Sequence, residues 1–471
     1  MSNNMRMETL PEWLVTALSG VPNHKRLRTL EEQIATCHEI RSRSHSRIRS
    51  FALGASAEGR TIELLSIGSG AKSVLVVGGP HPNEPIGGLT VEFLLSLMAS
   101  DPALQERLDC SWHFIIAADP DGLVRNRGWL VENPTLDRYL DHYFRPALID
   151  QPEYTFPLDA EEVRFRSSTP ENLAWQRALE ICRPHLQVSL HGAEFGGAFF
   201  LLSRPVANLV QGLQSLPAAC GVPMSRIGEP LLETTPLAEG VFQLPDIATI
   251  VSQSRSANST GAGWPAGQSS AGFATRFGTF SLVPEVPIWD AAELHDTTAG
   301  GDSMAAILEA HVERAERLVD VLDSRTESER SAMAEIDALP ARSVDEACVL
   351  LPTQIATIRA LLESRRDALS DPLQRGASVG LDSLLRVFLL RTMSALRSLA
   401  SRTRSHLGSD SECTVTLQNT DRLLAEGLSE LTKMVHLRPV PLKSVVSVQA
   451  GAALMAAALT CCDFPSAAAP K

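Results

Sequence analysis

The sequence predicts an α/β fold with a mixed, mostly parallel sheet flanked by helices, followed by a C-terminal α-helical region. From about residue 26 to 295, short apolar runs alternate with helical patterns, as expected of a sheet covered by helices. After about residue 300, apolar residues recur at three- and four-residue spacing, which is typical of amphipathic helices. We therefore expect an α/β domain (1–300), a helical region (301–440) and a tail or packed helix (441–471).

Helical periodicity in the first part of the chain predicts helices at residues 26–47, 86–100 and 171–183. The apolar runs between them have the length of strands, and most end in Gly, Pro or a charged residue. These runs are IELLSIG, SVLVVGG, SWHFIIAA, LQVSLHG, AFFLLS and TFSLVPE. Open α/β sheets bind ligands outside the carboxyl ends of their strands. Polar residues that follow these runs are therefore the first candidates for a functional site.

Two further stretches complete the organisation of the chain. Residues 252–278 are rich in Ser, Gly and Ala, which predicts a long loop that forms a mobile wall or lid over the site. The region after residue 300 predicts three to five helices in a bundle, from amphipathic stretches at 302–324, 343–364, 379–401 and 420–436. Amphipathic patterns alone do not show whether these helices cap the first domain, form an oligomer interface or restrict access to small substrates.

The composition excludes several classes of partner. The formal net charge is −13 and no basic block is present, so we expect no nucleic-acid partner. The eight cysteines are scattered and are interpreted as reduced thiols. The N-terminus lacks the features of a secretory signal, which predicts a cytoplasmic protein. The C-terminal run 445–462 is long enough to suggest a membrane span, but Ser447, Gln449 and Gly451 interrupt it, and we expect no membrane partner.

Four residues that follow apolar runs have the chemistry of a metal site. His81 and Glu84 are three residues apart just after one predicted strand, and His191 follows another. Two histidines and a carboxylate form a three-ligand set that leaves the fourth position of zinc open to water. Glu285 ends a further apolar run, where a metal-bound water needs a base. Each residue alone is a weak signal, because such residues in loops are usually solvated.

The stretch from about residue 26 to 289 contains the segments FALGASAEGRTIELLSIG and GGPHPNEPIGG. The first resembles the Gly-x-Ser-x-Glu-Gly-Arg segment and following strand of the carboxypeptidase A-like zinc peptidase family, and the second resembles the zinc-binding loop of that family. DPDGLVRNRGW resembles its Asn-Pro-Asp-Gly segment, with Asp119 in place of the asparagine. SSTPENLAWQRAL, SLHG and SLVPEVP continue the match in the same order. The resemblance therefore covers the order and the flanks of the four candidate residues.

The resemblance implies a fold of the zinc carboxypeptidase kind, one zinc ion held by His81, Glu84 and His191, and general acid and base catalysis by Glu285. Bound zinc would supply a Lewis acid and a water of lowered pKa, and the resemblance implies that Glu285 accepts the proton of the water that attacks the amide carbonyl. Glu285 then passes the proton to the leaving amine. This implies a hydrolase that releases the C-terminal amino acid of a peptide or peptide-like substrate.

The substrate-binding residues depart from the family pattern. A tetrahedral oxyanion and a terminal carboxylate both need positive donors, which arginine supplies well. We assign the catalytic donor to Arg125, and substrate binding to Arg145, Asn126, Arg127 and Trp264. The arginines of the Arg125–Arg127 segment come sooner after Pro-Asp-Gly than in the family. The family's tyrosine before the catalytic glutamate is missing, and Trp264 stands at about its place. Arg164 and Arg166 are further candidates for binding the carboxylate.

Two other functions stay open at the level of sequence. The first is a deacylase or amidohydrolase of small N-acyl amino acids, similar to relatives that resemble succinylglutamate desuccinylase and aspartoacylase. The second is a metal-containing scaffold whose helical region binds a partner protein. Oligomerisation through the helical region is a further expectation. Side-chain preference depends on pocket walls near the loop 254–278, whose path no sequence pattern fixes.

Overall fold

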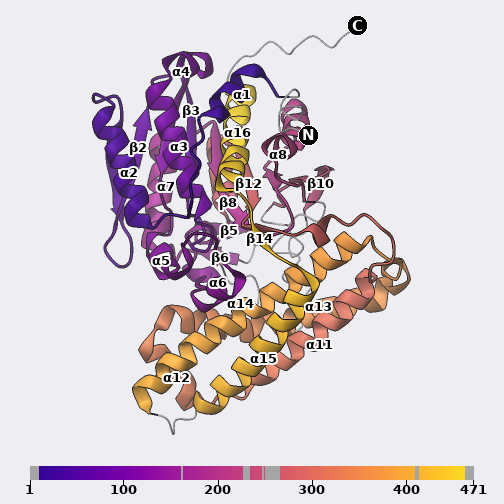
Figure 1. Cartoon of the computed structure of the whole chain (residues 1–471). Helices are drawn as coiled ribbons and strands as arrows, with labels where there is room; N and C mark the ends of the chain where they lie inside the picture. Colours follow the sequence, from indigo (N-terminus) through magenta and orange to yellow (C-terminus); the bar gives the residue numbers. More distant parts are fainter. Residues whose placement is uncertain are drawn as a thin grey trace.

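A mixed sheet forms the centre of the α/β part of the molecule (Figure 1). The computed structural model describes residues 10–160, 163–225, 234–246, 249, 266–408 and 413–461. The main sheet has the strand order β1-β2-β4-β3-β7-β12-β9-β11-β10, and β8 pairs with β12. Strands β4, β3, β7 and β12 are parallel, whereas the outer pairs β1–β2 and β10–β11 are antiparallel. The predicted α/β class with a mixed, mostly parallel sheet is therefore confirmed.

The six predicted apolar runs all contain strands of this sheet. The bounds are β1 (Arg49–Ala55), β2 (Thr61–Ile67), β3 (Lys72–Val77), β4 (Cys110–Ile115), β7 (Leu186–Ser189), β8 (His191–Ala193), β9 (Phe199–Leu202), β10 (Thr235–Ala238), β11 (Val241–Gln243) and β12 (Phe280–Pro287). The run LQVSLHG is divided at Leu190 into β7 and β8. Strands β1, β10 and β11 were not predicted, because β1 and β10 are largely exposed and β11 is only three residues long.

Helices flank both faces of the sheet. They are α1 (Glu12–Ser19), α2 (Leu30–Arg43), α3 (Ile86–Ser100), α4 (Pro102–Leu108), α5 (Pro120–Arg125), α6 (Leu136–Asp141), α7 (Pro170–Cys182), α8 (Ala207–Cys220) and α10 (Ser270–Ala274). The predicted helices correspond to α2, α3 and α7. Helix α2 begins at Leu30 because Thr29 and Glu32 form a reciprocal capping box before and inside its first turn.

Alternate residues of β3 enter two different apolar clusters. Val74 and Val76 belong to the larger cluster, which contains buried residues of α3. Leu75 and Val77 belong to the smaller cluster, which contains Trp175 of α7. This alternation is the period of two that a strand imposes on its side chains. The sheet is therefore buried on both faces where β3 ends, and this end carries the loop to His81.

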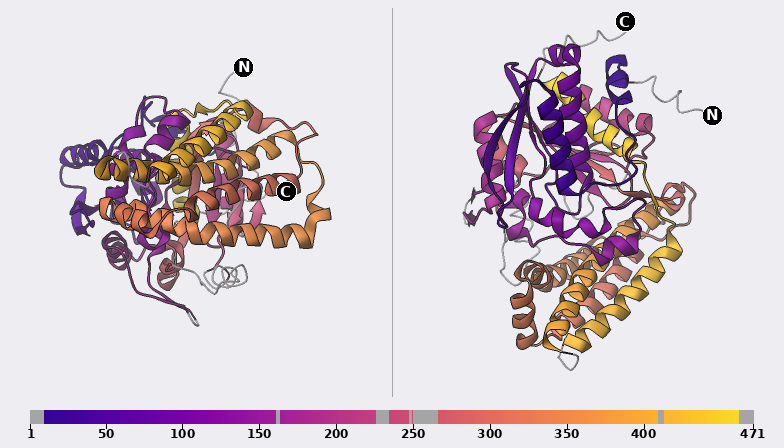
Figure 2. Two further views of the ribbon diagram at one scale, coloured as in Figure 1. Left: turned by 90° about the horizontal axis from the view of Figure 1, so that it is seen from below. Right: turned by 60° about the vertical axis from the view of Figure 1, so that its left-hand side comes forward.

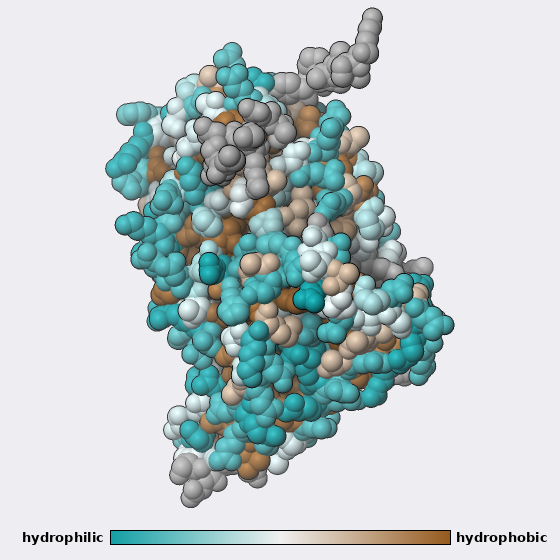
Figure 3. Space-filling model, turned by 45° about the vertical axis from the view of Figure 1, so that its right-hand side comes forward, coloured by the Kyte–Doolittle hydropathy of each residue, from teal (hydrophilic) through white to brown (hydrophobic). Residues whose placement is uncertain are grey.

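A bundle of long helices follows the sheet in sequence. It consists of α11 (Met304–Asp323), α12 (Glu327–Ile336), α13 (Ala338–Leu369), α14 (Arg375–Leu407) and α15 (Cys413–Met434). The bundle lies below the α/β part in the view of Figure 1, and the second view of Figure 2 agrees. The predicted C-terminal helical region is thereby confirmed. In Figure 3, the visible face of the bundle is mainly hydrophilic, with hydrophobic residues in small separate groups.

The chain returns from the bundle to the sheet. Strand β14 (Arg438–Pro439) pairs with β13 (Trp289–Asp290), and α16 (Leu442–Thr460) then packs beside α3, α8 and β12. Helix α16 is long and apolar enough to cross a membrane by length and composition, and 78% of its apolar window is buried inside the molecule. Helix α16 therefore belongs to the core around the sheet. A small hairpin, β5 (Leu158–Ala160) and β6 (Val163–Phe165), lies apart from the main sheet.

Candidate metal centre

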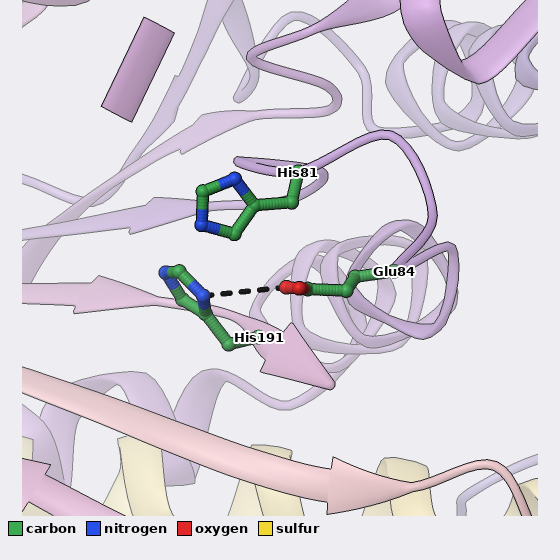
Figure 4. A group of neighbouring side chains, drawn as sticks. All are labelled: His81, Glu84 and His191. Carbon is green, nitrogen blue, oxygen red and sulfur yellow. Dashed lines mark ion pairs between the residues drawn. The ribbon is translucent and has the colours of Figure 1, made fainter. Parts of the chain in front are cut away.

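The loop after β3 presents His81 and Glu84. The strand ends at Val77, and a Cβ at Gly78 would lie 2.5 Å from the backbone oxygen of Ile116, so only glycine fits where this loop passes β4. The backbone N of Glu84 donates to the oxygen of His81 at 3.1 Å, which closes a turn before α3 begins. The turn directs both side chains to one side of the loop (Figure 4).

The sheet places His191 and Glu285 next to each other. His191 is the first residue of β8, and it is paired in register with Glu285 on the parallel strand β12. The Nδ1 atom of His191 lies 3.6 Å from Oε1 of Glu285. Residues paired on neighbouring strands project to the same face of a sheet. The pairing of β8 with β12 therefore brings together two residues that are far apart in sequence.

The three predicted ligands converge in the structure. One potential ligand atom from each of His81, Glu84 and His191 lies within 4.8 Å of the others. Figure 4 shows the two imidazole rings and the carboxylate pointing toward one another. Nδ1 of His191 lies 3.2 Å from Oε2 of Glu84, which also accepts a hydrogen bond from the backbone N of Gly192 at 3.2 Å. All three side chains are buried. Such a buried group of nitrogen and carboxylate ligands suits zinc.

The protonation of His81 also fits a cation site. Nδ1 of His81 is buried and makes no hydrogen bond with any residue that the structure describes. Burial lowers the pKa of His81 well below its ordinary value, and the charge of Arg145 adds to this effect. The imidazole is therefore neutral, and one of its two ring nitrogens has a lone pair that can bind a metal ion. These properties are what a metal-binding histidine requires.

The second histidine lies among negative charges. Burial alone would lower the pKa of His191, but the hydrogen bond and charge of Glu84, together with the charge of Glu285, raise it to about 9. The carboxylates therefore attract positive charge to the point where the ligands meet. A cation at this point would replace the proton, since metal ligation requires the neutral imidazole.

The structure places Arg145 beside this group. Its Nη1 lies 3.2 Å from Oε1 of Glu84 and 3.5 Å from Oδ1 of Asn83. Asn126 is fully buried, and its side chain bonds to the backbone N and O of Phe144 at 3.2 and 2.7 Å. Asn126 thus holds the segment that carries Arg145, and it does so through Phe144.

The predicted catalytic donor Arg125 is held by other charged groups, and Arg127, predicted to bind substrate, faces the surface. Arg125 pairs with Glu58 at 3.1 Å and with Asp337 of the helical region at 2.7 Å. Arg127 is exposed. Trp264 lies outside the residues that the structure describes. Arg164 and Arg166, the further candidates for binding a carboxylate, both pair with exposed Asp159 of the small hairpin.

Sequence reasoning missed several residues around the metal group. The ring of Tyr154 stacks on His81 with centroids 5.6 Å apart. Glu153 is buried and accepts hydrogen bonds from the backbone N and Oγ of Ser270, at 3.0 and 2.8 Å. Burial raises the pKa of Glu153, although the charge of His191 opposes this. The chain has only three tyrosines, and all fall within residues 139–154. That clustering was a signal in the sequence for this segment.

Comparisons with known proteins give a family and distant structural likenesses. A sequence profile described as zinc carboxypeptidase matches residues 34–136, which include His81 and Glu84. No curated protein matches the sequence. The match confirms, over this segment, the resemblance to zinc carboxypeptidases that the sequence motifs indicate.

Solved structures similar to the chain include a metallo-carboxypeptidase from Burkholderia cenocepacia, with 17% identity and a TM-score of 0.33. That match covers 55% of this chain and 60% of the other. Carboxypeptidase A from Helicoverpa armigera matches with 15% identity over 61% of this chain and 72% of the other, at a TM-score of 0.38. A murein-tripeptide amidase from Escherichia coli O157 matches with 13% identity over 50% and 82%, at a TM-score of 0.26. The chain thus spans less than two thirds of the Burkholderia protein.

Proposed function

We propose that the protein is a zinc-dependent hydrolase that cleaves the C-terminal amide bond of a peptide or peptide-like substrate. The observation that carries the proposal is the convergence of His81, Glu84 and His191, with Glu285 beside them through the register of β8 and β12. The family match over residues 34–136 supports the same class of activity. The ligand set leaves room in a tetrahedral zinc site for water.

Glu285 and the bound metal have different proposed roles in hydrolysis. Bound zinc would supply a Lewis acid and a water of lowered pKa. Glu285 is proposed to accept a proton from the attacking water and to donate it to the leaving amine, because its carboxylate adjoins His191 at 3.6 Å. Its buried position keeps this proton transfer away from bulk solvent.

Arg145 is proposed to bind the terminal carboxylate of the substrate. It lies next to the metal ligands through its contact with Glu84, and a planar guanidinium has several N–H donors for a carboxylate. Its side chain keeps 24% of its surface accessible, which leaves donors for a ligand. A residue that binds this carboxylate beside the metal would direct cleavage to the last peptide bond.

A deacylase of small N-acyl amino acids is a second candidate. The exposed fractions of His81, Glu84, His191 and Glu285 are 2, 5, 7 and 9%. Such low exposure of the four side chains favours a small substrate over the end of a folded protein. The same four residues would perform the same chemistry on an acyl amide, so the two candidates differ only in the acyl part of the substrate.

One experiment tests both candidates. Zinc content and hydrolysis of a panel of N-blocked dipeptides and N-acyl amino acids would be measured for the wild type and for Glu285→Gln. Stoichiometric zinc with peptide cleavage that is lost in the variant supports the carboxypeptidase. Cleavage confined to N-acyl amino acids supports the deacylase. Zinc without turnover of any substrate would contradict both and leave a scaffold role.

A further inference from the structure

A glutamine of the last helix joins the two segments that carry the metal ligands. Gln449 is fully buried on α16. Its Nε2 donates to the backbone oxygen of His191 at 2.7 Å, and its Oε1 accepts from Oγ1 of Thr90 at 2.6 Å. Thr90 lies in α3, the helix that follows the loop of His81 and Glu84. One amide group thus connects all three ligands through their backbone segments.

An arginine of the helical region holds the other end of β8. Nη1 of Arg391 on α14 donates to Oε1 of Glu194 at 2.7 Å. Glu194 follows the last residue of β8, and its Oε1 also accepts from the hydroxyl of Tyr139 at 2.6 Å. Burial alone would raise the pKa of Glu194, but the charge of Arg391 and these hydrogen bonds hold it below its ordinary value. The contact is therefore an ion pair.

Glu194 also joins β8 to the end of β12. Its backbone oxygen accepts hydrogen bonds from the backbone N of Trp289 at 2.8 Å and of Ile288 at 3.2 Å. Both donors follow Glu285 closely in the chain. Arg391 thereby fixes a residue at which the strand of the proposed base and the strand of His191 are tied together.

Simple packing does not require these polar groups. An apolar side chain at position 449 would fill the same place in α16 without needing partners, whereas a buried amide is tolerated only when its hydrogen bonds are made. The two groups meet β8 at its two ends, and β8 is only three residues long, His191–Ala193. So short a strand depends on outside contacts for its orientation.

We propose that Gln449 and Arg391 are positioning residues of the metal site, which hold the two ends of β8 and orient His191 for metal binding. Helices α14 and α16 then contribute to the site. The proposal rests on the proposed function only in that His81, Glu84 and His191 bind zinc. Outer contacts of this kind typically change metal affinity by about 10- to 100-fold when they are removed.

The test is the zinc affinity of the full-length protein, measured by competition with a chromogenic chelator. Gln449→Met and Arg391→Met are each expected to bind zinc about 10- to 100-fold more weakly than the wild type. Arg391→Lys, which keeps a charged donor, is expected to recover part of this loss. Thr90→Val leaves the bond from Gln449 to His191 in place and is expected to have a smaller effect.

Matched controls lie on the same two helices. Oγ of Ser447 donates to the backbone oxygen of Lys443 within α16. Arg397 on α14 forms ion pairs with Asp141 and Asp421. Ser447→Ala and Arg397→Met are expected to stay within about threefold of the wild type in zinc affinity. The melting temperature of each zinc-free variant reports any general loss of folding. If Arg391→Met fails to fold, Arg391→Lys takes its place, and if Gln449→Met fails to fold, Gln449→Glu, which keeps an oxygen but loses the donor to His191, takes its place.

The outcomes separate this proposal from the proposed function. Unchanged zinc affinity in Gln449→Met and Arg391→Met, or equal losses in the controls, would overturn the positioning role even if the enzyme is active. If the variants bind zinc more weakly but the wild type cleaves no substrate, the positioning role is supported and the peptidase activity is contradicted. A wild type that binds no zinc overturns both.

Discussion

Oε1 of Glu285 lies 3.6 Å from Nδ1 of His191, because the two residues are paired in register on β12 and β8. This relationship joins a candidate ligand and a candidate base through main-chain pairing, which is more rigid than a loop contact. A slip of one residue in this register would turn Glu285 to the opposite face of the sheet. The proposed chemistry therefore depends on the strand pairing that the fold provides.

Glu285→Gln tests the proposed base. Glutamine has the same shape but cannot accept the proton, so kcat should fall by about 10²- to 10⁴-fold while bound zinc stays the same. Steady-state kinetics and zinc analysis check this. Glu293→Gln, which changes a glutamate paired with His436 beyond the site, is the matched control. A kcat for Glu285→Gln within tenfold of the wild type would remove Glu285 from the mechanism.

Arg145→Met tests the binding of the terminal carboxylate. For a blocked dipeptide with a free carboxyl end, kcat/KM should fall by about 10- to 100-fold, because a charge-assisted hydrogen bond is lost. For the same dipeptide with an amide in place of the terminal carboxylate, kcat/KM should change by less than about threefold in this variant. Arg164→Met, on the small hairpin, serves as the control. Equal losses for acid and amide would mean that Arg145 supports the site in another way.

Leu454→Ala tests whether α16 is a core helix. Leu454 is fully buried, and its truncation should lower the free energy of unfolding by about 2–5 kcal/mol. Leu459 of the same helix is 37% exposed, and Leu459→Ala should cost less than about 1 kcal/mol. Urea unfolding of both variants measures the difference. Similar small costs at the two positions would argue against the packing of α16 around the sheet.

Glu346→Gln tests the contact between α13 and the segment after Arg145. Glu346 accepts a hydrogen bond from the backbone N of Leu148 at 2.8 Å, and burial raises its pKa to about 7, although that bond opposes the shift. This pKa is above the value in the unfolded chain. The wild type therefore keeps the associated stability below about pH 4.5 and loses it as the pH rises through about 7.

Glutamine keeps the acceptor and carries no charge. Glu346→Gln should thus be more stable than the wild type by about 1–2 kcal/mol at about pH 8, allowing for solvent screening, and nearly equal at about pH 4. Urea unfolding at the two pH values is the measurement, with the exposed Glu363→Gln on the same helix as control. A difference independent of pH would show that the ionisation of Glu346 is not coupled to folding.

Local patterns in the sequence predicted the parts of the fold that depend on neighbouring residues. Apolar runs identified β3, β7 and β12, and helical spacing identified α2, α3 and α7. The segments with His81, Glu84, His191 and Glu285 were found because each follows such a run and because their flanks resemble one family. Exposed edge strands such as β1 gave no signal, since their burial pattern lacks an apolar run.

Contacts between distant parts of the chain were not predictable in this way. Gln449 and His191 are 258 residues apart, and the sequence showed only that a polar residue interrupts an apolar helix. Arg391 lies in an amphipathic stretch where an arginine is expected at the surface, yet it reaches Glu194. Periodicity shows which face of a helix is buried, but it does not show what that face contacts.

Zinc content of the full-length protein, purified without chelator, tests the central claim most directly. The wild type should contain about one zinc ion per chain, and His81→Ala and His191→Ala should each retain almost none, because two remaining ligands bind zinc weakly. Arg397→Met on α14 should retain zinc like the wild type. A wild-type protein that contains no zinc, and binds none when titrated with it, would contradict the account.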